Sequence, residues 1–119
     1  SVCIVKQKKG KHMKVTVVHT AFEDAPRIVA EVEAPADTAR VEDALEYAYR
    51  WTNNVMGSWS IKKEMLSEDY ANGDLNDRVT VKAPLHKGGL GLRSTSVGDM
   101  MHVNGRTFEV AMMGFQELI

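Results

Sequence analysis

The stretch Met100-Met-His-Val-Asn-Gly-Arg-Thr-Phe-Glu-Val110 decides the fold, because it is typical of two strands joined by a tight turn. Both central residues of a type I′ turn need positive φ, so the pair Asn104-Gly105 is a strong hairpin signal. Pairing Val103 with Arg106 then sets the register, and the hydrophobic pattern agrees with it. One side of the hairpin is expected to be buried through Met101, Val103, Phe108, Val110 and Met112.

Further strands are expected on both sides of a central break at Asp24 and Pro26. The predicted strands are Val2–Lys6, Met13–His19, Arg27–Glu33, a segment around Trp59 (58–60) and Val79–Ala83. The first two form a lysine-tipped hairpin with its turn at Gly10. In the third, Ile28, Ala30 and Val32 are expected to share one face, with Arg27, Val29, Glu31 and Glu33 on the other.

One helix is predicted over about residues 38–55, with Asp37 or Thr38 as its N-cap. Its inward side carries apolar or small residues at steps of three and four: Val41, Ala44, Leu45, Ala48, Thr52 and Val55. Glu46 and Arg50 are placed as an i,i+4 ion pair on the wet side. The fold expected is one α+β domain over residues 1–119, with a largely antiparallel sheet of about five or six strands packed against this helix.

Length and composition exclude several classes of protein. The chain has 119 residues, of which 44% are hydrophobic and 26% charged, and it has one cysteine, so neither a disordered tail nor a disulfide scaffold is expected. No run approaches the roughly 18 apolar residues of a membrane span, and no signal peptide is visible. We therefore expect no membrane partner and a cytoplasmic location, in the host cell if the protein is viral.

The net charge of −1 conceals a strong asymmetry along the chain. Residues 1–19 carry five lysines and no acid, whereas residues 20–49 carry eight acids and two arginines. A basic segment can neutralise phosphates, and an acidic helix can meet a basic partner. The alternative is structural, because lysines also protect an edge hairpin from aggregation.

No motif assigns a catalytic residue, a cofactor or a metal. Cys3 has no histidine at a recognisable spacing, and the spacings of zinc sites are absent. The carboxylates Glu42, Asp43 and Glu46 lie on the solvent side of the predicted helix, where solvation is the default. The segment 86–96 is rich in glycine and lacks a phosphate-loop signature, so a flexible linker is the favoured interpretation. The alternative is that Lys87 and Arg93 hold an anion.

The segment Arg93-Ser-Thr-Ser-Val-Gly-Asp99, the hairpin after it and Gly114-Phe115 carry a family resemblance, supported by residues 44–54 and 57–59. The chain resembles small proteins of bacteriophages and other mobile elements, and its ending is similar to that of YodL-like domains. The resemblance implies a mobile-element origin and an α+β domain, and it assigns no catalytic residue. The hydroxyls of residues 94–96 are also expected to satisfy backbone groups at a bend, and Gly98-Asp99 to form a turn before the hairpin.

The favoured function is that of a non-enzymatic accessory protein that binds a host or viral protein. The residues predicted to contact the partner are Lys6, Lys8, Lys9, Lys11, Lys87, Arg93, Glu42, Asp43 and Glu46. One alternative is a nucleic-acid-binding module that uses the basic N-terminal segment and the 86–96 loop. A second is a small hydrolase-like enzyme whose site is undetermined, and a homodimer through a strand edge or the C-terminal methionines is a further expectation.

Overall fold

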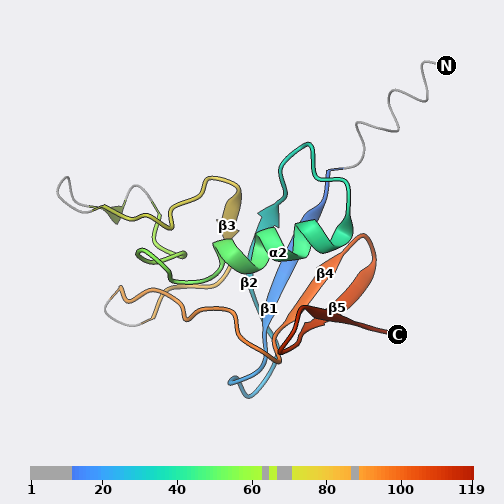
Figure 1. Ribbon diagram of the computed structural model, residues 1–119. Helices are drawn as coiled ribbons and strands as arrows, with labels where there is room; N and C mark the ends of the chain where they lie inside the picture. The colour runs from blue at the N-terminus through green and yellow to red at the C-terminus, as the bar shows by residue number, and fades with distance from the viewer. Residues whose placement is uncertain (1–11, 63–64, 67–70, 87–88) are drawn as a thin grey trace.

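The structure is a computed structural model that describes residues 12–62, 65–66, 71–86 and 89–119. A six-stranded antiparallel sheet in the order β3-β2-β1-β4-β5-β6 carries helix α2 across one face, as Figure 1 shows. The elements are β1 (Lys14–His19), β2 (Arg27–Glu33), α2 (Val41–Trp51), β3 (Val79–Val81), β4 (Met100–Val103), β5 (Arg106–Val110) and β6 (Phe115–Leu118). The α+β prediction is confirmed, and the predicted strand Val2–Lys6 lies outside the described residues.

The C-terminal hairpin has the predicted register. Val103 pairs with Arg106 and Met101 with Phe108, and both turn residues have positive φ, 52° at Asn104 and 75° at Gly105. The prediction for Met112 is wrong, because β5 ends at Val110 and the Met112 side chain is 90% exposed in the turn before β6.

Helix α2 is shorter than predicted at both ends. It begins after Arg40, which caps it without a side-chain hydrogen bond, so the prediction of Asp37 or Thr38 as the cap is wrong. It ends at Trp51, and Val55, predicted to face inward, is therefore exposed beyond the helix. Arg50 forms its ion pair with Asp74 and not with Glu46, because the 71–78 segment folds back under the end of the helix.

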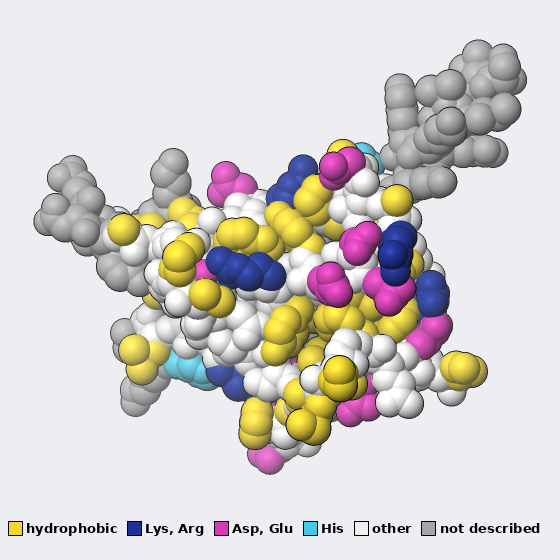
Figure 2. Space-filling model, viewed as in Figure 1, with side chains coloured by type: hydrophobic (Ala, Val, Ile, Leu, Met, Phe, Trp, Pro, Cys, Tyr) yellow, Lys and Arg dark blue, Asp and Glu magenta, His cyan; other side chains and the backbone are white. Residues whose placement is uncertain are grey.

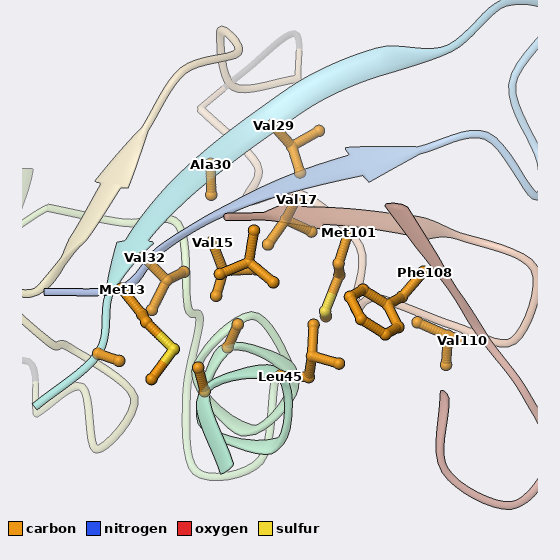
Figure 3. Close-up of a cluster of buried hydrophobic side chains, with 14 of the residues drawn as sticks. Met13, Val15, Val17, Val29, Ala30, Val32, Leu45, Met101, Phe108 and Val110 are labelled. Carbon is orange, nitrogen blue, oxygen red and sulfur yellow. The ribbon is translucent and has the colours of Figure 1, made fainter. Parts of the chain in front are cut away.

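The hydrophobic core lies between α2 and the sheet, and Figure 3 shows side chains of β1, β2, β4 and β5 converging on the helix. A bulge changes which residues of β2 take part. The register with β1 shifts so that Val17 pairs with Ala30 but Val18 pairs with Ile28, which leaves Val29 as the extra residue. Val29 is therefore buried and Ile28 is 53% exposed, so the prediction that Ile28 shares the face of Ala30 is wrong.

The segment around Trp59 forms turns where a strand was predicted. Trp59 is nevertheless buried in the core, with 2% of its surface exposed, and its indole N–H donates to the carbonyl of Arg93. Within the described residues, no helix has the length and apolar character needed to cross a membrane.

Candidate functional site

The predicted partner-binding residues separate into three groups. Lys6, Lys8, Lys9, Lys11 and Lys87 lie outside the described residues. Glu42, Asp43 and Glu46 are exposed on the solvent side of α2, as predicted. Arg93 is placed beside the loop between β1 and β2, where it pairs with Glu23 and Asp99, and it lines neither hollow that contains Glu46.

The Arg93 guanidinium is held between two carboxylates of its own chain. It donates to both oxygens of Glu23 at 3.0 and 2.8 Å and to both oxygens of Asp99 at 2.9 and 2.8 Å. A fifth hydrogen bond, of 2.9 Å, goes to the carbonyl of Ser94. A guanidinium has five N–H donors, so every donor of Arg93 is used within the fold.

Asp99 is the acceptor that organises this region. It is fully buried and accepts five hydrogen bonds, two from Arg93 and three from the main-chain N–H groups of Thr20, Ala21 and Ser96. Burial alone would raise the pKa of Asp99, but these donors outweigh it and lower its pKa to about 2. The carboxylate therefore stays charged and ties the β1–β2 loop to the segment before β4.

A buried chain of polar groups continues from this ion pair into the core. The ring Nε2 of His19 lies 2.9 Å from the Thr95 hydroxyl, which donates to the hydroxyl of Thr52 at 2.8 Å. Burial lowers the pKa of His19, although Asp99 Oδ2 lies 3.9 Å from the same nitrogen. His19, Thr95 and Thr52 are each at most 2% exposed, and Asp99 does not bind the other ring nitrogen as an orienting acid would.

This arrangement confirms the structural reading of the Arg93–Asp99 segment. The Ser94 hydroxyl accepts from the main chain of Asn54, and the N–H of Thr95 donates to the carbonyl of Thr52. The turn at Gly98 precedes β4, with φ of 98° at the glycine. The segment thus fastens the end of α2, the β1–β2 loop and the C-terminal hairpin to one another.

Asp74 fastens the loop after α2 in the same way. This fully buried carboxylate accepts from the N–H groups of Val55 and Met56 at 2.7 and 2.8 Å and pairs with Arg50 at 3.2 Å. Burial would raise the pKa of Asp74, and these contacts together lower it. Asp74 is therefore a structural residue of the 71–78 segment.

An open groove lies on the helix side of the sheet, between α2 and β6. Two adjoining hollows of about 260 and 240 Å³ share Glu46, Gly114 and Phe115 in their walls. We call them together the α2–β6 groove; its other lining residues are Glu42, Leu45, Tyr49, Arg106, Phe108, Val110, Ala111, Met112 and Glu117. Its floor is apolar, because the rings of Tyr49 and Phe115 meet edge to face at 6.2 Å over buried Val110.

The rim of the groove is acidic. Three carboxylates and one guanidinium line it, Glu42 and Glu46 on the helix, Glu117 on β6 and Arg106 on β5, so the lining carries a charge of −2. Glu42 pairs with Arg40 and Glu117 with Arg106, which leaves Glu46 as the lining carboxylate without an ion pair among the described residues. Figure 2 shows acidic side chains gathered over the end of α2 above β4 and β5, with exposed hydrophobic side chains below them. Met112 and Met113, at the end of the groove, are 90% and 92% exposed.

Another hollow, of about 510 Å³, lies on the other side of α2 and is lined by Tyr47, Trp51 and residues 75–78. Its lining contains one acid, Asp77, and one base, Arg78, so its net charge favours neither an acidic nor a basic partner. No group of three or more potential metal ligands occurs among the described residues.

Comparisons with known proteins give no match: no family model, no curated protein and no solved structure is similar to this chain.

The sequence predicted the exposed acids Glu42 and Glu46 of the groove, but it did not place Tyr49, Phe115 and Glu117 beside them. Glu42, Glu46 and Tyr49 follow one another at helical spacing, and this series marks the helix edge that faces β6. His19 was also missed, although it continues the alternation of Val15 and Val17 and so falls on their buried face.

Proposed function

We propose that this chain is a non-enzymatic protein-binding module that holds a basic segment of its partner in the α2–β6 groove. The observation that carries the proposal is an apolar floor under an acidic rim that no described part of the chain covers. The core lies beneath this surface with Phe108 and Val110 buried, and Tyr49 and Phe115 pack against it while they remain partly exposed.

The chemistry of the groove favours a partner with lysine or arginine beside an apolar side chain. Glu46 belongs to both hollows and is exposed, so it can meet a cation without first losing another partner in the described structure. The aromatic floor of Tyr49 and Phe115 offers apolar area, and the adjacent methionines supply an adaptable surface. If the chain comes from a mobile element, as its resemblance implies, the partner is a host or viral protein.

Nucleic acid is the weaker candidate for this surface. The acidic rim would repel a phosphate backbone, and Arg93 could contact a phosphate only by giving up hydrogen bonds to Glu23 or Asp99.

The proposal is tested with peptides selected from a displayed library of random sequences against the full chain. We expect selected peptides to be enriched in Lys or Arg and to lose about tenfold in affinity when Glu46→Lys reverses the rim charge. Glu109→Lys is the matched control, because Glu109 lies on the face of the sheet away from the helix. Peptides whose binding is the same for the wild type, E46K and E109K would show that the groove is not the binding site.

A further inference from the structure

We propose that the basic segment binds as an added β-strand on the free edge of β6, with a cationic and an apolar side chain two residues apart on its helix-facing side. This inference rests on the proposed function and specifies how the groove reads its partner. It follows from three properties of β6: a free edge, the direction of its main-chain groups, and the direction of its side chains.

β6 ends the sheet on one side, and no described residue pairs with its outer edge. The other edge is formed by β3, which has only three residues and is followed closely by Pro84. Short edge strands and prolines limit pairing with another chain. β6 has four residues and no proline, so it is the edge that accepts a strand more readily.

The main-chain groups of β6 that point outward can be identified from the ladder. The N–H of Val110 donates to the carbonyl of Asp99, so the main chain of Val110 points towards β4. Directions alternate along an antiparallel strand, so Glu109 points towards β6 and its partner Gln116 points back. Phe115 and Glu117, on either side of Gln116, therefore direct their N–H and C=O groups to the free edge.

The side chains of the same two residues lie on the helix side. Phe115 is opposite Val110 and Glu117 is opposite Phe108, and both partners are buried beneath α2. An added strand would thus place one residue beside Phe115 and the Tyr49 ring, and the residue two positions away beside Glu117 and Glu42. The first position favours an apolar side chain. The second favours a cation, because its hollow is also lined by Glu46, the one of its three carboxylates that has no ion pair among the described residues, whereas Glu117 pairs with Arg106 and Glu42 with Arg40.

A second copy of this chain fits the edge less well. Two β6 strands paired about a twofold axis would bring both acidic rims together, because a twofold interface joins the same surface of each copy. The two rims, each with a charge of −2, would then repel one another. A basic segment would instead neutralise the rim that it meets.

The test compares two peptides of equal composition against the full chain by fluorescence anisotropy. Both peptides have the same length and the same residues and differ only in their order. The first contains Lys-x-Leu-x-Lys, which places the lysines and the leucine on one face whichever way the strand runs. The second contains Lys-x-x-Leu-x-x-Lys, which places the leucine on the opposite face from the lysines. We expect the first to bind at least about tenfold more tightly, since only it can fill the apolar floor and meet the acids together.

A pair of variants isolates the main-chain contact. Both Glu117→Ala and Glu117→Pro remove the carboxylate, but only the proline removes the outward N–H. We expect E117P to bind about fivefold more weakly than E117A, the loss of about one hydrogen bond. If E117P melts at a much lower temperature than E117A, the main-chain contact is tested from the peptide side instead. Peptides methylated at one main-chain nitrogen at a time are then expected to lose affinity when the methyl group is at every second position.

Equal binding of the two peptides, or equal effects of the two Glu117 variants, would overturn strand addition while E46K sensitivity still supported the groove. A peptide affinity that is unchanged by E46K would overturn the proposed function itself. If the wild-type chain sediments as a dimer and the E117P variant sediments as a monomer, a second copy occupies the edge. That result would also overturn the inference.

Discussion

The Arg93–Asp99 region and the α2–β6 groove differ in how their charged groups are satisfied. Around Arg93 and Asp99, charged groups are enclosed and every guanidinium donor is used inside the chain. In the α2–β6 groove, Glu46 is exposed and has no ion pair among the described residues, and it lies beside an apolar floor that the chain leaves open. Charge that is satisfied internally holds the fold together, whereas charge left beside exposed apolar surface is available to a partner. Substitutions in the first region should therefore alter stability, and those in the second should alter binding.

The largest effect is expected for Asp99→Asn. The substitution leaves Glu23 as the only charged partner of Arg93 and puts an amide nitrogen, which cannot accept, where a carboxylate oxygen accepts at least two buried hydrogen bonds, so the free energy of unfolding should fall by about 3–5 kcal/mol. Urea denaturation measures it, with Glu109→Gln, a half-buried acid of β5, as the control. A loss below about 1 kcal/mol would show that the buried ion pair does not fasten the β1–β2 loop.

Alanine substitutions at Phe108 and Phe115 compare the core directly with the floor of the groove. Phe108 is 5% exposed, and Phe108→Ala should lower the free energy of unfolding by about 3–5 kcal/mol. Phe115 is only partly buried, so Phe115→Ala should cost about 1 kcal/mol while weakening the selected peptides at least about fivefold. Thermal melts and anisotropy on the same samples separate the two effects, and equal stability losses would contradict the distinction.

His19 should make the enclosed region sensitive to mild acid. Its pKa is lowered in the folded protein by burial, so the unfolded chain binds a proton more readily and stability is lost as the pH falls below about 6.5. We expect about 1 kcal/mol less stability at pH 5 than at pH 7, and a flatter profile for His19→Gln. Below pH 4 the lowered pKa of Asp99 adds a second loss, because the unfolded carboxyl is then protonated first. Parallel profiles for the two proteins between pH 5 and 7 would exclude His19 as the group responsible.

The smallest effect on stability is expected at the exposed methionines. Met112→Ser and Met113→Ser should change the free energy of unfolding by less than about 0.5 kcal/mol, because both side chains are almost fully in solvent. Peptide affinity should fall about twofold for Met112, which lines the groove, and not for Met113, which does not. A stability loss above 1 kcal/mol would mean that the turn contributes to the core.

Prediction succeeded where the deciding chemistry is local. Asn104-Gly105 sets its own turn, and the spacing of Ala44, Leu45 and Ala48 marks the buried side of α2 without knowledge of the rest of the chain. It failed at Ile28 and Met112, because a bulge in β2 and the end of β5 are decided by neighbouring strands. The acids of the groove were predicted as exposed residues, but the surface they form was not.

By itself, the sequence determined the α+β class, the register of the C-terminal hairpin and the acidic side of the helix, because turn geometry and side-chain periodicity act over a few residues. Only the tertiary structure decided that Arg93 is enclosed, since Glu23 lies 70 residues before it. It also decided that Tyr49 and Phe115 share a groove, because their contact depends on how the helix crosses the sheet. Contacts between residues far apart in the chain are set by packing, and packing is what separates the enclosed charges from the available ones.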